Sequence, residues 1–271
     1  MGGLLDFHFM QNAYAAGTLV ALLAVAAGYF VVLRGQSFAA HMLSQVGFAG
    51  AAAAVLLGVS PVLGLLVFCG GAALAIGALG REVDPGDRTE SAAVGSILAL
   101  ALGLGLLFIR LHGAGTQAIY AFLFGTILGI TDTDVQLTAL VAVAGLALLA
   151  AIGRPLVFAS VDPDVAEARG VPVAALSLAF ILILAMSVAI TVQIVGTLLI
   201  FALLVAPGAA ALQITARPIA GVALTVALSV AVTWIGLALA YYTNLPVGFF
   251  VTTLAFGAYA AVRTVRAVAV A

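Results

Sequence analysis

The stretch Ala13–Leu33, AYAAGTLVALLAVAAGYFVVL, contains no charged residue and decides the class of fold. As an α-helix, a run of about 21 residues extends over roughly 30 Å, the thickness of the hydrocarbon core of a bilayer. The segment before it, MGGLLDFHFMQN, has no Arg or Lys, so we expect a first membrane span and not a cleaved signal peptide. Similar apolar runs recur along the chain, which predicts several membrane-spanning helices.

The composition of the whole chain supports this interpretation. Hydrophobic residues make up 65% of the 271 residues and charged residues 7%, whereas a soluble domain needs roughly a quarter charged residues. The mean hydropathy is +1.33. Outer-membrane barrels alternate apolar and polar residues in units of about ten, and the sequence shows no such alternation. We therefore predict an all-α, polytopic transmembrane bundle.

The apolar runs and the prolines between them predict about nine spans, with a range of eight to ten. Several spans begin close to a proline at the first helical position, where the missing N–H costs nothing. The expected spans are 13–33, 38–59, 61–79, 92–109, 134–152, 173–190, 194–212, 218–241 and 246–265.

The apolar segment Ile119–Ile130 is too short to cross the membrane, because it would form a helix of about 18 Å. We predict a re-entrant or broken segment, which is tolerated only against protein or a water-filled path. With this segment not spanning and the N-terminus outside, Arg110 is the one arginine of nine that falls outside the cytoplasmic side. The positive-inside rule thus favours an N-out, C-in orientation.

Several kinds of chemistry are excluded by residue counts. Cys69 is the single cysteine, so one chain forms neither a disulfide framework nor a thiolate metal cluster. All nine basic residues are arginines, and a phosphate-binding loop needs a lysine, so any nucleotide must bind to another chain. The net charge is -1 and the basic residues form no stripe along the sequence, which argues against nucleic acid as a partner.

Scarce polar side chains gather at the start of the second expected span. His41 and Gln45 are four residues apart and share one helix face, with Ser37 and Ser44 on its flanks. Measured from Arg34, they lie about 10 and 16 Å into the membrane. Polar groups at such depth normally face a pathway or the bundle interior. An imidazole and an amide oxygen can bind a divalent metal, and a two-fold dimer would bring two copies of each to its axis. The alternative is that both side chains hydrogen-bond neighbouring helices.

The polar segment Ser160–Val173 has the signals of a short, self-capped helix. Asp162 is the expected N-cap and Pro163 the first helical residue, while Gly170 is the expected stop. Asp164 and Glu167 lie toward the positive end of the helix dipole and Arg169 toward the negative end. A helix of about two turns is marginal in water, so we expect it to pack on something else, such as a cytoplasmic partner protein. The alternative is an ordinary connector.

Other polar features have simpler interpretations. The link Gly80–Ser91 is expected to be a solvated loop, and Asp132 and Asp134 are expected to cap a helix. His8 and His112 lie in expected external segments. The dipeptide Pro207-Gly208 is expected to kink the seventh span.

Four motifs in order resemble one family, the permease subunits of bacterial ABC importers for zinc and manganese. They are FMQNAYAAGTLVALLAVAAGYFVVLRGQSFAAHMLSQVGFAG at 9–50, AFLFGTILGITDTD at 121–134, VDPDVAEARGVPVAALS at 161–177 and VGTLLIFALLVAPGAAA at 195–211. The resemblance covers nearly the whole chain.

This resemblance implies one permease domain over residues 1–271, with a fold like that of the vitamin B12 importer permease, in the bacterial cytoplasmic (inner) membrane. It implies a homodimer in contact with lipid, a cytoplasmic ABC ATPase that binds ATP, and an extracytoplasmic metal-binding protein. No permanent cofactor is implied, since the metal, zinc or manganese with iron as a third option, is transported. The segment 158–171 would dock on the ATPase.

The chain departs from the family at its metal ligands. Typical members carry Asp and His four residues apart on the second helix, where this chain has His41 and Gln45. The anionic ligand that offsets the desolvation of the cation is thus absent. A softer His-based site would favour zinc over manganese; the alternative is that passage relies less on direct coordination.

Two other functions compete with an importer permease. A stand-alone ion-coupled transporter or channel usually buries carboxylates, and the expected spans contain no acid except Asp134 at an edge. An intramembrane enzyme would need paired carboxylates, a His-rich metal motif or an activated nucleophile in the spans, and the expected spans show none of these patterns.

Overall fold

The computed structural model describes residues 6–79, 88–113 and 125–270. Within these ranges the chain is helical and contains no strand. The helices are α1 (His8–Leu33), α2 (Ser37–Leu56), α3 (Pro61–Leu79), α4 (Arg88–His112), η1 (Ile127–Gly129, a 3₁₀ turn), α6 (Asp132–Val161), α7 (Pro163–Ala168), α8 (Val173–Val195), α9 (Thr197–Ile214), α10 (Pro218–Thr243) and α11 (Val247–Val270).

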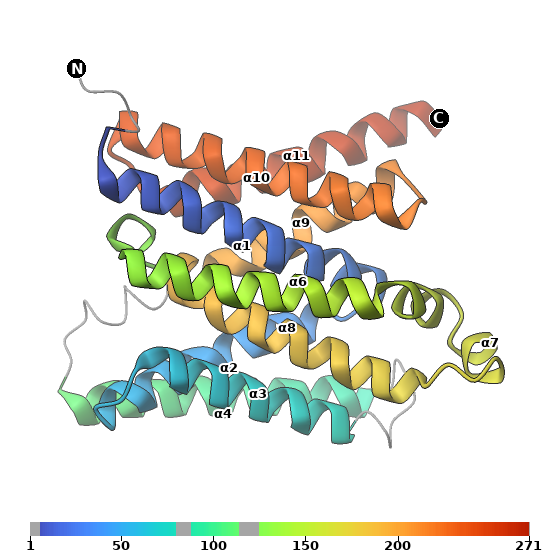
Figure 1. Ribbon diagram of the computed structural model, residues 1–271, viewed down its shortest axis with the longest axis horizontal. Helices are drawn as coiled ribbons and strands as arrows, with labels where there is room; N and C mark the ends of the chain where they lie inside the picture. The colour runs from blue at the N-terminus through green and yellow to red at the C-terminus, as the bar shows by residue number, and fades with distance from the viewer. Residues whose placement is uncertain (1–5, 80–87, 114–124, 271) are drawn as a thin grey trace.

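The long helices run roughly along one axis of the molecule (Figure 1). Among the described residues, seven are long and apolar enough to cross a membrane, namely α1, α2, α4, α6, α8, α10 and α11. The apolar parts of α3 and α9 are shorter, Pro61–Gly77 and Leu199–Ile214. The all-α transmembrane bundle is therefore confirmed, while the count of about nine spans and the N-out, C-in orientation stay predictions.

The bundle has an inner and an outer set of helices. The most apolar 18-residue window is 72% buried in α1 and 78% buried in α2, but only 17% buried in α4 and in α11. Helix α1 packs against α6, α9 and α10, while α2 packs against α3, α4 and α8. The exposed apolar side chains of the outer helices suit contact with lipid. Helix α2 belongs to the inner set, where polar side chains are shielded from lipid.

Helices α2 and α3 approach closely at a pair of glycines. A Cβ added to Gly50 would collide with the backbone of Gly64, and one added to Gly64 would collide with the backbone of Gly50. Small residues at such positions let two helix backbones come together inside a membrane. This contact fixes α2 against its neighbour.

Several helix boundaries differ from the sequence-based expectation. Helix α4 begins at Arg88, so the expected loop Gly80–Ser91 ends early, and its residues 80–87 lie outside the described ones. Helix α6 continues through Pro155 to Val161, well past the expected end of its span at residue 152. Hydropathy marks the part of a helix that lies in lipid, whereas the backbone hydrogen bonds of α6 continue beyond it.

The expected link between the sixth and seventh spans shrinks to a single residue. Helix α8 ends at Val195 and α9 begins at Thr197, with Gly196 between them at a φ of 86°. Only glycine adopts this conformation without strain. The expected re-entrant or broken segment Ile119–Ile130 falls partly outside the described residues, and its described end consists of Gly125, Thr126, the η1 turn and Ile130.

Candidate functional site

The polar face of α2 is partly buried at its start and buried further along the helix. His41 is partly buried, and its ring and that of Phe201 of α9 form an edge-to-face contact, with 5.3 Å between ring centroids and 74° between ring planes. Its Nδ1 atom is buried and has no hydrogen-bond partner among the described residues. An imidazole nitrogen without a partner can bind a metal ion, or it can form a hydrogen bond with a second chain.

Gln45 lies one turn further along the same face. Its side chain is 5% exposed, and its Oε1 atom also lacks a hydrogen-bond partner among the described residues. A buried carbonyl oxygen without a partner costs roughly 1–3 kcal/mol. His41 and Gln45 thus offer two ligand atoms, Nδ1 and Oε1, that the described part of the chain leaves unsatisfied.

The two flanking serines differ in their surroundings. Ser37 begins α2 and is partly exposed. Ser44 is fully buried, and its hydroxyl donates to the carbonyl oxygen of His41 at 2.7 Å. This bond satisfies the Ser44 hydroxyl within its own helix. The role of either serine in lining a pathway stays a prediction.

One chain does not assemble a closed metal site in the part that the structure describes. No three side chains of His, Cys, Asp or Glu come together there. Cys69 is buried, and its thiol donates to the carbonyl oxygen of Leu43 at 3.3 Å. A site on α2 with three or more His, Cys, Asp or Glu ligands would therefore need groups from outside the described residues.

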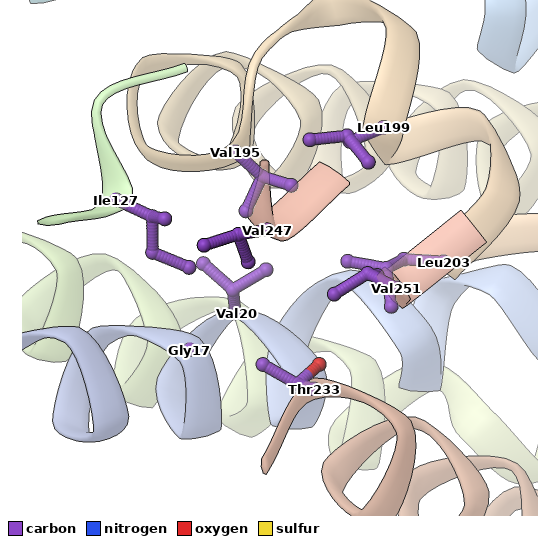
Figure 2. A pocket seen from close by; sticks show the side chains of 9 residues that line it. All are labelled: Gly17, Val20, Ile127, Val195, Leu199, Leu203, Thr233, Val247 and Val251. Atoms are coloured by element: carbon purple, nitrogen blue, oxygen red, sulfur yellow. The ribbon is translucent and has the colours of Figure 1, made fainter. Parts of the chain in front are cut away.

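A small cavity lined by α1, η1, α8, α9, α10 and α11 is too apolar to form a metal route. Figure 2 shows its lining side chains, of which Thr233 alone has a side-chain oxygen. Its volume is about 10 Å³, roughly the space of one water molecule. It is lined by Gly17, Val20, Ile127, Val195, Leu199, Leu203, Thr233, Val247 and Val251.

The expected capped helix is present as α7, which lies at one end of the bundle beyond α6 and α8 (Figure 1). Asp162 is its N-cap and accepts from the Val165 N–H at 3.0 Å, and Pro163 occupies the first position. At the other end, Gly170 has a φ of 81° and its N–H bonds to the carbonyl of Glu167. The local structure predicted for this segment is confirmed.

One side of α7 is held and the other is free. Ala166 is fully buried and packs with Ala159 of α6 and Leu176 of α8. The Arg169 guanidinium lies 5.9 Å from the centre of the Phe158 ring. The outward side chains include Asp164, Glu167 and Val165, the last 43% exposed. The segment therefore presents an acidic and apolar surface on a rigid base.

A polar network joins three helices at the opposite end of the bundle. Thr131 and Asp134 form a capping box at the start of α6, which confirms the expected capping role of Asp134, whereas the same role was wrongly expected of Asp132, which is the first helical residue. The Gln193 amide of α8 donates to Asp134 at 2.9 Å, and the Asn12 amide of α1 donates to Asp132 at 2.7 Å. His8 Nε2 lies 3.5 Å from the Asp132 carboxylate, and both side chains are exposed.

Helix α9 continues through Pro207 and Gly208. A Cβ on Gly208 would lie 3.1 Å from the carbonyl oxygen of Gly28, so this part of α9 lies close to the backbone of α1. The expected kink at Pro207-Gly208 stays a prediction.

The comparison with known proteins now decides the family. The model of the ABC 3 transport family matches residues 6–265. The chain belongs to the ABC 3 transport family. This confirms the resemblance carried by the four motifs and makes the chain a multi-pass permease subunit of the inner membrane.

Relatives of this ABC 3 family protein cover most of its length. It is similar to the manganese transport system membrane protein MntC of Halalkalibacterium halodurans, at 31% identity over 79% of this chain and 72% of the relative. It is also similar to the manganese import system permease protein ScaB of Streptococcus parasanguinis, at 30% identity over 91% of this chain and 86% of the relative.

Solved structures agree on the fold. PsaBC from Streptococcus pneumoniae, in complex with Fab, aligns with a TM-score of 0.86 and 28% identity over 96% of this ABC 3 protein and 92% of that chain. An inward-facing, putative metal-chelate type ABC transporter aligns with a TM-score of 0.67. Its identity of 14% supports the fold alone.

Sequence reasoning missed some residues of the ABC 3 protein that meet the predicted ones. Phe201, against His41, sits in an apolar run where no pattern distinguishes it. Gln193 lies in the expected link between two spans, for which the sequence predicts no contact. It is a strongly polar residue with apolar neighbours on both sides. That isolation was the available signal for its contact with Asp134.

Proposed function

We propose that this chain is the membrane permease of an ABC importer that moves a divalent transition metal across the cytoplasmic membrane. The observation that carries the proposal is the pair of buried, unsatisfied ligand atoms, Nδ1 of His41 and Oε1 of Gln45, on an inner helix of an ABC 3 family chain. In a cycle of alternating access, this face of α2 lines the route of the metal. The metal is cargo and not a resident cofactor, so a site with few ligands suits its passage.

The proposal includes a homodimer. Two copies related by a two-fold axis would bring two imidazoles and two amides toward that axis, which supplies four candidate ligands where one chain offers two. Neutral imidazole and amide oxygen hold a divalent ion without offsetting its charge, so binding is weak and release is fast. The same lack of a carboxylate favours zinc over manganese, although several similar proteins carry manganese in their names.

Energy comes from a separate ATPase. The described chain is a permease and not an enzyme, and α7 is the element proposed to dock on the ATPase, through Asp162, Asp164, Glu167, Arg169 and Gly170. Its outward acids and exposed Val165 form a surface that a basic, partly apolar groove would fit. In the N-out, C-in orientation α7 is cytoplasmic, and the opposite end, with His8 and Asp132, faces the metal-binding protein.

A stand-alone ion-coupled transporter is the competing function. That mechanism usually buries a carboxylate for coupling. Asp132 is exposed and Asp134 is already bonded to Thr131 and Gln193 at a helix start, so neither suits the role.

The test is the metal-dependent stimulation of ATP turnover by the complex of permease, ATPase and binding protein in lipid. Wild type is compared with His41→Ala and Gln45→Ala, and Ser37→Ala examines the flank of the same face. Loss of zinc or manganese stimulation in the first two variants, with basal ATP turnover intact, supports the route along α2. Unchanged stimulation would make His41 and Gln45 packing groups, and failure of wild type to respond to any of zinc, manganese or iron would refute the function.

A further inference from the structure

Arg34 lies in the turn between α1 and α2 and reaches both helices that flank α7. Its Nη1 donates to the Ser160 hydroxyl at 3.1 Å, and its Nη2 donates to the Ser177 hydroxyl at 2.6 Å. Ser160 is the second-last residue of α6, and Ser177 is in the first turns of α8. The guanidinium also lies 5.8 Å from the centre of the ring of Phe180, a fully buried residue of α8.

Two backbone hydrogen bonds close the turn that carries Arg34. Gly35 has a φ of 68° and its N–H bonds to Val32, while the N–H of Gln36 bonds back to Val31 at 2.8 Å. These two bonds form a Schellman motif, which ends α1 and sets the direction of the chain. Helix α2 begins directly afterwards at Ser37, one helical turn before His41. A displacement of Arg34 is therefore passed on to the start of the polar face of α2.

The connection from α6 through α7 to α8 is built in the same way. Asp162 both ends α6 and caps α7. After α7 a second Schellman motif bonds the Val171 N–H to Ala166, and Val173 then bonds to Val171 across Pro172, whose φ of -77° and ψ of 77° are those of an inverse γ-turn. Backbone hydrogen bonds thus close the turns that join the three helices, and the ends of α6 and α8 that these turns connect to α7 are the ones that hold Arg34.

Arg34 is unlike an arginine that merely marks the membrane interface. No carboxylate of the described residues lies within ion-pair distance of it, and burial lowers the pKa of its guanidinium. Arg154, on the same helix as Ser160, is exposed. Partial burial of a cation without a counter-charge is costly. The hydrogen bonds from Arg34 to two hydroxyls on two helices offset part of this cost.

We propose that Arg34 is a positioning residue of the transport cycle, which couples movement of α7 to the polar face of α2. This rests on the proposed function, in which the ATPase docks on α7. The residue touches neither metal nor ATP; it acts through Ser160 and Ser177 on one side and through the α1–α2 turn on the other.

The experiment measures the number of metal ions transported per ATP hydrolysed by the complete complex in lipid vesicles, with zinc and manganese as probes. We expect Arg34→Ala to lower this ratio at least about fivefold, the lower end of coupling free energies between sites. Affinity for the ATPase should stay at the wild-type level. Arg34→Lys keeps the charge but replaces the planar guanidinium, whose two nitrogens each bond one hydroxyl, by a single nitrogen, so it should restore the ratio only in part. Arg154→Ala is the matched control and should leave the ratio unchanged.

A double variant, Ser160→Ala with Ser177→Ala, keeps the arginine and serves if Arg34→Ala does not fold. It should lower the ratio as Arg34→Ala does, and combining all three changes should lower it no further. The proposal is overturned if Arg34→Ala or the serine double variant transports metal with the wild-type ratio, or if Arg34→Lys restores the ratio fully. If wild type itself shows no ATP-dependent transport, the proposed function fails first, and the two failures are thereby distinguished.

Discussion

Replacing Asp162 by alanine removes the N-cap of α7 and tests whether this helix docks as a folded unit. The Asp162 carboxylate accepts the Val165 N–H at 3.0 Å and lies at the positive end of the helix dipole. Loss of a cap costs about 1 kcal/mol, within a range of 0.5–2, and the charge adds about 0.3–1 kcal/mol. Because α7 has only six residues and must be folded to dock, we assign this cost of about 1–2 kcal/mol to docking. It corresponds to a weakening of roughly 5- to 30-fold in affinity for the ATPase.

The assay is the affinity between the ATPase subunit and the permease in lipid nanodiscs. Asp162→Asn is the matched control, because asparagine caps as well as aspartate and loses only the charge. We expect Asp162→Asn to weaken binding less than about fivefold. Equal weakening by the two variants would show that charge and not capping matters, and unchanged affinity in Asp162→Ala would refute the reasoning.

Three further predictions concern packing and polar contacts. Gly64→Ala should destabilise the protein by about 1–3 kcal/mol, because its new Cβ meets the backbone of α2. Gly70→Ala has open space beside it and should not destabilise the protein. Thermal unfolding in detergent compares the two variants, and equal unfolding midpoints would contradict the close contact. Gln193→Leu should lower the unfolding midpoint by removing a bond to the charged Asp134, worth about 1.5–3 kcal/mol, and an unchanged midpoint would show that this bond contributes nothing. Cys69 should resist a maleimide probe until the protein is unfolded because its side chain is fully buried, so rapid labelling of the folded protein would contradict this packing.

Local signals explain what the sequence could predict. The caps of α7 were predicted residue by residue, since Asp162, Pro163 and Gly170 act on backbone groups within four positions of themselves. The shared face of His41 and Gln45 likewise follows from helical periodicity alone. Their burial follows from the cost of polar groups in lipid.

Contacts between distant segments could not be predicted. Arg34 bonds to residues 126 and 143 positions away, and Gln193 bonds to Asp134 over 59 positions. No periodicity or composition encodes such pairs, because they depend on how whole helices pack. The ends of α4 and α6 were misjudged for a related reason, since hydropathy detects the lipid-facing part of a helix and not the hydrogen bonds that extend it.

The central claim, that a divalent metal passes along the polar face of α2, is tested most directly by metal accumulation in vesicles. The vesicles contain the permease with its ATPase, the metal-binding protein is supplied on the side of His8, and zinc or manganese is measured inside with and without ATP. The account predicts ATP-dependent accumulation by wild type and its loss in His41→Ala and Gln45→Ala, with ATPase binding retained. Accumulation without ATP, or at the wild-type rate in both variants, would contradict it.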